Sequence, residues 1–326
     1  MEERINWPEP GKYVLAVSGG VDSMVLLGLL AGAAAARGYE LAVAHFDHGI
    51  RADAREDAAL VRRVAAARGL ECAVGEGRLG AGASEAAARA ARHEFLGRAA
   101  AERGARLVTA HHRDDLLETS LLNLARGTGR RGLAPMQGGG AGGVGGAGRA
   151  AVAIRRPLLG VDKAELLDYA RARGLEWRED STNADLFNPR NFLRRELLPR
   201  ADEQWRSEYL GLVEKMAELN LEIDSRLAEL AGLAALADLV VAEPETALSG
   251  HRVAIDRRVA RDLTLAELSE LILYLARRLD PVAEPDRRLL TELALFVKIG
   301  RSGKRRPLRA GLHIEINRQN IILKLA

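Results

Sequence analysis

Residues Ser18-Gly19-Gly20-Val21-Asp22-Ser23 connect an apolar strand-like run, KYVLAV (12–17), to a helix-like run, MVLLGLLAGAAAAR (24–37). A strand, a short glycine-containing loop and a helix form a phosphate-binding site, because glycine lets the backbone approach an anion and the first N–H groups of the helix lack acceptors. The stretch therefore predicts nucleotide binding. An ordinary strand-to-helix turn capped by a serine is the structural alternative.

The side chains of this loop fit the same interpretation. The hydroxyls of Ser18 and Ser23 are further donors to a phosphate, and the carboxylate of Asp22 is a candidate ligand for Mg²⁺. The other common phosphate-binding pattern, G-x-x-x-x-G-K-[ST], does not occur in the chain.

The composition is that of a globular protein: 326 residues, of which 48% are hydrophobic and 29% charged. This length predicts about two domains. The single cysteine, Cys72, excludes a disulfide framework, a cysteine-based zinc site and a C-x-x-C pair within one chain. The first residues lack the apolar region of a signal peptide, and no uncharged apolar run has the length of a membrane span, so we expect a cytoplasmic protein without membrane contact.

Short apolar runs alternate with alanine-rich helical segments in the first half of the chain. The runs cover residues 12–17, 41–46 and 106–110, and the helical segments cover 53–68 and 84–103. This alternation predicts an α/β fold with a doubly wound, mostly parallel sheet. Ligands of such sheets bind outside the carboxyl ends of the strands.

Polar residues follow three of these predicted strands. The first strand is followed by the loop 18–23, the second by His45, Asp47 and His48, and the third by the run from His111 to Asp115. Because parallel strands end at the same edge of a sheet, we expect these groups to converge on one site. Nucleotide contact by the histidines is one interpretation, and a structural role is the other; zinc binding would need further ligands.

The segment TAHHRDDLLETS (109–120) carries paired carboxylates. Asp115 and Glu118 share one face at the start of a predicted helix, where the helix dipole favours negative charge. Capping of that helix is one role for them, and binding of a small cationic substrate or Mg²⁺ is the other. Arg126 begins a basic, glycine-rich turn, RGTGRRG, that suits phosphates.

Basic side chains also recur on two other helical faces. Arg89 and Arg92 share a face with Glu85, so they form either surface ion pairs or a clamp for a carboxylate or phosphate. Arg190 and Arg194 lie on a further basic face in RNFLRRELLP (190–199).

The remaining chain predicts a domain boundary near residue 200. Residues 151–156 predict a strand, and residues 157–173 a helix capped by Asp162 and Glu165. A long helix follows over 203–239, then helices over 264–278 and 285–297, and a hairpin over 313–325. Residues 1–200 are therefore the expected catalytic domain, and residues 201–326 a linker helix with a smaller, largely helical domain.

Two further stretches have unusual composition. From residue 286 to 326 there are ten Lys/Arg and three Asp/Glu, a net charge of +7, which indicates either a solvated surface or nucleic-acid contact. Gly138–Gly148 is a low-complexity stretch with no strand before it, so a loop is expected there rather than a dinucleotide site; its role stays open.

Taken in order, several blocks of this sequence resemble the bacterial tRNA(Ile)-lysidine synthases, members of the PP-loop superfamily of ATP pyrophosphatases. The blocks are SGGVDS, HFDHGIR, EAAARAAR, TAHHRDDLLETSLLNLARGTGRRGL, RRPLLGVDKAELLDYAR, EDSTNAD and RNFLRRELLP. They extend over about the first 60% of the chain. SGGVDS alone marks only the superfamily, whereas the later blocks are specific to the family. Leu116 departs from the family pattern, in which many members have Gln.

The resemblance implies the PP-loop form of the α/β fold and a ligation in two steps. ATP adenylates the C2 carbonyl oxygen of the wobble cytidine of a CAU-anticodon tRNA(Ile), and the ε-amine of free lysine then displaces AMP. ATP would contact residues Ser18 to Ser23, His45, Asp47 and His48, with Mg²⁺ near Asp22.

For the second substrate, the resemblance implies that Asp115 and Glu118 bind the α-ammonium of lysine and that Arg89 or Arg92 binds its carboxylate or a phosphate. His111 and Asp114 are both candidates for the base that deprotonates the amine. Arg126, Arg190, Arg194, Arg195 and the basic C-terminal segment would contact tRNA. A homodimer is left open.

Three other functions compete with this one. A tRNA sulfur transferase generally needs cysteines or an iron–sulfur cluster, and the chain has one cysteine. An ATP-dependent amide ligase of small molecules would leave the basic second domain unexplained. A non-catalytic nucleotide-binding module would release no pyrophosphate from ATP.

Overall fold

The computed structural model describes most of the chain, as two compact units that divide between Ala217 and Glu218. The described residues are 1–47, 49, 54–77, 85–136, 152–178, 189–235, 252–280, 285–308 and 311–325. His48, the stretch Gly138–Gly148 and the EDSTNAD block lie outside them. The two compact units divide inside the long helix Glu203–Ala235. The expected domain boundary at residue 200 stays a prediction.

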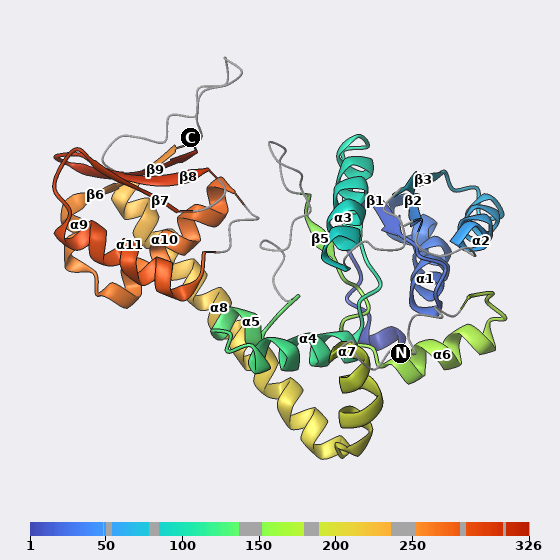
Figure 1. Ribbon diagram of the computed structural model, residues 1–326. Coiled ribbons are helices and arrows are strands. Elements are labelled where there is room, and N and C mark those ends of the chain that lie inside the picture. The colour runs from blue at the N-terminus through green and yellow to red at the C-terminus, as the bar shows by residue number, and fades with distance from the viewer. Residues whose placement is uncertain are drawn as a thin grey trace. The chain divides into compact units, whose positions relative to one another are not determined.

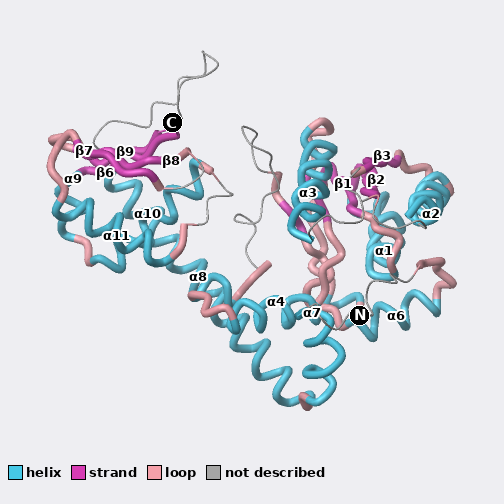
Figure 2. Tube along the Cα trace, viewed as in Figure 1, coloured by secondary structure: helices cyan, strands magenta, loops and turns pink. Residues whose placement is uncertain are grey.

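The first unit contains a five-stranded sheet in the order β3-β2-β1-β4-β5, parallel throughout (Figures 1 and 2). Its strands are β1 (Gly11–Ala16), β2 (Tyr39–Asp47), β3 (Cys72–Glu76), β4 (Arg106–Val108) and β5 (Ile154–Arg155). The doubly wound, mostly parallel fold predicted from the sequence is confirmed. Chain order reverses between β1 and β4, and this switch point is where such sheets bind ligands.

Helices cover both faces of this sheet (Figure 1). On one face α1 (Val21–Arg37), α2 (Ala54–Ala66) and α6 (Lys163–Ala172) bury a core with β1 and β2. On the other face α3 (Glu85–Ala101) packs on the opposite side of the same strands. The long apolar runs of α1 are explained by this position, because Leu26 and Leu27 are fully buried. The predicted cap of α6 is confirmed: Asp162 is its N-cap, and Glu165 completes the capping box.

The first unit is completed by short elements at the carboxyl edge. They are η1 (Glu2–Arg4), α4 (Arg113–Ala125), α5 (Arg130–Leu133), α7 (Pro189–Phe192), the π-helical turn η3 (Leu193–Leu197) and η4 (Leu198–Arg200). The long helix α8 (Glu203–Ala235) begins in this unit, where Leu210 and Val213 pack against Leu117 of α4.

The second unit is a four-stranded antiparallel sheet with helices. The strands follow the order β6-β9-β8-β7, formed by β6 (Arg252–Asp256), β7 (Lys304–Pro307), β8 (Leu312–Ile316) and β9 (Asn320–Leu325). The helices are α9 (Arg257–Asp262), α10 (Leu265–Leu279) and α11 (Arg287–Ile299). The predicted hairpin and both predicted helices are confirmed. Strands β6 and β7 were not predicted. β7 reads KRRP, is exposed along its length and lacks any apolar alternation.

Candidate functional site

The loop after β1 has the geometry of an anion site. Gly19 has φ +96°, a left-handed conformation that favours glycine. The loop is closed internally: the Ser18 N–H donates to Ser23 Oγ at 3.1 Å, and that hydroxyl donates to the Gly20 carbonyl at 2.8 Å. Gly20 is the N-cap of α1 and has no side chain to cap the helix. The first N–H groups of this 17-residue helix are therefore left for a ligand.

The end of β2 contributes groups that are already engaged. His45 is buried, and its Nδ1 lies 2.8 Å from the carbonyl of Val17, immediately before the loop. Burial lowers the pKa of His45. Asp47 accepts a hydrogen bond from the Gly49 N–H at 2.7 Å. Both residues therefore support the strand ends around the loop, and direct nucleotide contact stays a prediction.

The start of α4 brings a buried histidine among carboxylates. His112, the N-cap of α4, is 2% exposed. Its Nε2 lies 3.3 Å from Asp115 Oδ2 and 3.7 Å from Asp22 Oδ2, which belongs to the phosphate-binding loop. Burial alone would lower the pKa of His112, but the contact with Asp114 and the charges of Asp115 and Asp22 raise it above its ordinary value. A positive imidazolium here would attract both Asp22 of the loop and the carboxylates at the start of α4.

The two candidate bases differ. Asp114 accepts a hydrogen bond from the Lys163 N–H at 2.9 Å. Burial would raise the pKa of Asp114, but His112 and this backbone bond lower it to about 2, which makes Asp114 a very weak base. Nδ1 of His111 lies 2.8 Å from Thr109 Oγ1, and burial lowers the pKa of His111 to about 4. His111 is therefore neutral at pH 7 and able to accept a proton.

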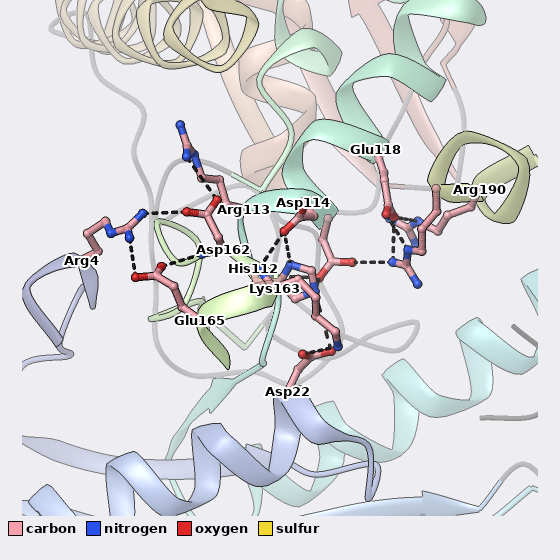
Figure 3. A network of polar contacts seen from close by, with 12 residues as sticks. Arg4, Asp22, His112, Arg113, Asp114, Glu118, Asp162, Lys163, Glu165 and Arg190 are labelled. Atoms are coloured by element: carbon pink, nitrogen blue, oxygen red, sulfur yellow. Dashed lines mark hydrogen bonds and ion pairs between the residues drawn. The ribbon is translucent and has the colours of Figure 1, made fainter. Parts of the chain in front are cut away.

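Lys163 is a site residue that the sequence analysis missed. It is the first residue of α6, and its Nζ donates to Asp22 Oδ1 at 2.6 Å (Figure 3). The positive end of the helix dipole disfavours a cation at this position. A lysine directly after the predicted N-cap Asp162 is therefore unusual, and this is the signal by which the sequence could have identified Lys163 as a site residue.

A network of ion pairs holds the N-terminus of α6 (Figure 3). Asp162 pairs with Arg4 at 2.7 Å and with Arg113 of α4 at 3.2 Å. Arg4 also pairs with Glu165. Together with the bond from Lys163 to Asp114, these contacts fix the backbone from which the Lys163 side chain extends to the loop.

Glu118 lies in a second network. It is 1% exposed, and Arg194 binds both its oxygens, at 2.7 and 2.9 Å. Arg190 lies 3.1 Å from Glu118 and donates to Thr119 Oγ1 at 2.6 Å. Burial raises the pKa of Glu118 while Arg194 opposes that shift. The predicted residues Glu118, Arg190 and Arg194 are thus brought together, with Asp115 3.6 Å from Arg194.

The other predicted arginines lie in different places. The positive charges of Arg89 and of Arg156, which follows β5, add to burial in lowering the pKa of His111. Helix α3 therefore presents positive charge toward the end of β4. The charge of Arg92 likewise contributes to the lowered pKa of the neighbouring His93. Arg126 is exposed at the far end of α4, about 16 Å along the helix from Asp115.

Among the described residues, no group of three or more His, Cys, Asp or Glu side chains has an arrangement that could hold a metal ion, and no described helix is suited to span a membrane. Mg²⁺ commonly binds proteins through one or two carboxylates together with substrate phosphates. Asp22, a residue of the loop, provides one such carboxylate.

Comparison with known proteins places the sequence among enzymes that share this loop. The family model described as a PP-loop domain matches residues 2–201. A tRNA(Ile)-lysidine synthase of Pseudomonas aeruginosa is 41% identical over 229 residues, which is 70% of this chain and 50% of that protein. The tRNA(Ile)-lysidine synthase of Deinococcus radiodurans is 37% identical over 272 residues, 81% of this chain and 44% of that protein. The chain spans about half the length of these curated relatives.

Among solved structures, the U34-tRNA thiolase NcsA of Methanococcus maripaludis, determined with its [4Fe-4S] cluster, has a similar fold. The TM-score is 0.53 at 18% sequence identity, over 65% of this chain and 74% of that chain. This similarity concerns the fold alone.

Proposed function

The chain belongs to the PP-loop domain family, and we propose that it ligates free L-lysine to C2 of the wobble cytidine of a CAU-anticodon tRNA(Ile). The observation that carries the proposal is the 41% identity to a tRNA(Ile)-lysidine synthase over 229 residues, 70% of this chain. The reaction consumes ATP and yields lysidine, AMP and pyrophosphate.

In the first step, the C2 carbonyl oxygen of the cytidine attacks the α-phosphorus of ATP, and the bond to pyrophosphate breaks. Negative charge on the phosphates must be neutralised for this step. The loop from Ser18 to Ser23 supplies N–H and hydroxyl donors, and Lys163 supplies a positive charge within reach of the loop. Asp22 would hold Mg²⁺, which neutralises phosphate charge when bound.

In the second step, the ε-amine of lysine attacks C2, the C–O bond to AMP breaks and the amine loses a proton. Asp115 is the proposed ligand of the α-ammonium, because its carboxylate is 17% exposed whereas that of Glu118 is only 1% exposed. Glu118 contributes by holding Arg194 beside Asp115. Arg89 or Arg92 would bind the carboxylate of lysine or a phosphate.

The proton of the amine requires an acceptor. His111 is the better candidate of the two, because its pKa of about 4 is higher than the pKa of Asp114, about 2, and because the Asp114 carboxylate already holds α6. Its pKa of about 4 makes it a weak base, so it would accept the proton only as the C–N bond forms.

The tRNA would be bound through its phosphates. Arg126, Arg190 and Arg194 in the first unit, and the exposed basic strand β7 in the second, are the proposed contacts. The substrates imply a cytoplasmic protein, and a homodimer stays a hypothesis. An amide ligase of small molecules would release pyrophosphate from ATP without tRNA, and a nucleotide-binding module would release none.

The test is incorporation of labelled lysine into an unmodified CAU-anticodon tRNA(Ile) transcript, with and without ATP. We expect ATP-dependent incorporation that is lost when the wobble C is replaced. Pyrophosphate release without incorporation would overturn the lysidine assignment while leaving ATP cleavage in place. No turnover of either kind would leave only nucleotide binding.

A further inference from the structure

Arg178 touches the phosphate-binding loop from a distant part of the chain. It follows α6, and its backbone N–H donates to the Gly19 carbonyl at 3.0 Å. In a planar trans peptide the C=O and the following N–H point in opposite directions. The bond from Arg178 therefore turns the Gly20 N–H away from Arg178 and into the loop, where it donates to Ser18 Oγ at 3.4 Å.

The side chain of Arg178 is fixed as well. Its Nε lies 2.7 Å from Asp57 Oδ1 and its terminal nitrogen lies 2.5 Å from Glu56 Oε2, both in the first turn of α2. Asp57 is buried, with only 6% of its surface exposed. Arg178 thus ties the loop, through its backbone, to the start of α2, through its guanidinium.

Gly19 packs directly against the same turn of α2. A Cβ atom added to Gly19 would lie 3.5 Å from the Cβ of Asp57, and its φ of +96° would strain any other residue. The loop, α2 and Arg178 therefore form one packed unit in which the orientation of the Gly19–Gly20 peptide is set by contacts outside the loop.

We propose that Arg178 is a positioning residue for the nucleotide phosphates: anchored by Asp57 and Glu56, it holds the Gly19–Gly20 peptide with its N–H directed into the loop, where a phosphate would take the place of Ser18 Oγ as acceptor. This inference rests on the proposed use of ATP. Without the side-chain anchor, the backbone N–H of Arg178 holds the Gly19 carbonyl less firmly, and the orientation of the Gly20 N–H must be restored each time a phosphate binds. That cost falls on nucleotide binding and leaves the lysine site unchanged.

The experiment compares Arg178→Ala with Arg63→Ala. Arg63 pairs with Glu176 and so joins the same two segments, but from the last turn of α2, at the other end of the helix from Asp57. For Arg178→Ala we expect the KM for ATP, and the Kd for a non-hydrolysable ATP analogue measured by calorimetry, to rise about tenfold, with the KM for lysine unchanged. Arg63→Ala should leave all three constants at the wild-type values.

Coupling to Asp57 supplies a second measurement. Asp57→Asn should raise the same Kd, and the double variant should bind the analogue no more weakly than Arg178→Ala alone, because both act on one peptide. Arg178→Lys should recover part of the loss. Equal Kd values for Arg178→Ala and Arg63→Ala would overturn the proposal, as would a rise in the KM for lysine to the same extent as that for ATP. If Arg178→Ala does not fold, Asp57→Asn decides by the same criteria.

Analogue binding separates this inference from the proposed function. A wild-type protein that binds the analogue but forms no lysidine would remove the assigned reaction and leave the role of Arg178 testable by the same Kd values.

Discussion

Lys163 at the start of α6 donates to Asp22 at the start of α1, with 2.6 Å between Nζ and Oδ1. The pair places a positive charge, on a long side chain, next to the first turn of the helix that follows the phosphate-binding loop. Because Asp22 is also the proposed Mg²⁺ ligand, Lys163 would lie beside the phosphates of a bound nucleotide.

Lys163 should determine the rate at which ATP is cleaved. Lys163→Gln should lower kcat for ATP-dependent pyrophosphate release by about 10²- to 10³-fold, the usual effect of losing a charge that stabilises a transition state. Single-turnover pyrophosphate release measures it. Lys12→Gln is the control, since Lys12 pairs with Glu40 on the exposed surface. A wild-type rate for Lys163→Gln would exclude this role.

Asp115 should determine the affinity for lysine. We expect Asp115→Ala to raise the KM for lysine about tenfold or more while the KM for ATP changes little, because the α-ammonium of lysine loses its proposed partner. The variant also loses the hydrogen bond from the His112 N–H to Asp115 that caps α4, so its folding is checked by circular dichroism. Steady-state kinetics with each substrate varied in turn provides the measurement. Asp168, which pairs with Arg171 on the exposed face of α6, offers the matched control. An unchanged KM for lysine would remove the assignment.

The pair of Arg194 and Glu118 should matter for stability. Removing Arg194 leaves a buried carboxylate with fewer partners, so Arg194→Ala should lower the free energy of unfolding by about 3 kcal/mol. Urea unfolding followed by circular dichroism would detect it. Arg195→Ala, at the exposed neighbouring position, should have little effect. Equal stability of the two variants would show that Glu118 is adequately paired without Arg194.

His93 should make the stability depend on pH. Burial, followed by the charges of Arg89, Arg92 and Arg156, lowers the pKa of His93 to about 4. The unfolded chain then binds more protons than the folded protein below the ordinary histidine pKa of about 6.5, so stability is full above that pH and falls down to about pH 4.

We expect His93→Gln to remove about 1–2 kcal/mol of this decrease between pH 7 and pH 4.5, because glutamine does not titrate. Parallel denaturant titrations of both proteins across that range would measure the difference. Superimposable pH profiles would mean that His93 keeps an ordinary pKa in the folded state.

The basic strand β7 should contact nucleic acid. Lys304, Arg305 and Arg306 lie on the edge of the second sheet, where positive charge also prevents edge-to-edge association. If they bind phosphates, replacing them together with alanine should reduce the slope of log K against log salt by about 0.9 for each phosphate that is no longer neutralised. Filter binding of tRNA at several salt concentrations would show this. Arg288→Ala, in an exposed pair with Glu292 on α11, serves as the control.

An unchanged salt slope would assign the strand to protection of the sheet edge alone. Association of the triple-alanine variant into larger species, detected by light scattering, would support that second explanation.

Elements with strong local patterns could be predicted from the sequence. The apolar run 12–17 became β1, the capping residues Asp162 and Glu165 began α6, and the alternating C-terminal run formed β8 and β9. Each depends on a period or a cap that neighbouring residues specify. Strand β7 was missed because its place in the sheet comes from pairing with β8, not from its own side chains.

Local periodicity and the geometry of parallel strands were enough to predict the turn between β1 and α1, the parallel sheet and the approach of Asp22 to the polar groups at the start of α4. The pairing of charges depends instead on how distant segments pack. Lys163 meets Asp22 across 141 residues and Arg194 meets Glu118 across 76, and no local pattern specifies such partners. They are selected by the packing of α6 against the sheet and of η3 near α4, where a buried charge needs a partner of opposite charge.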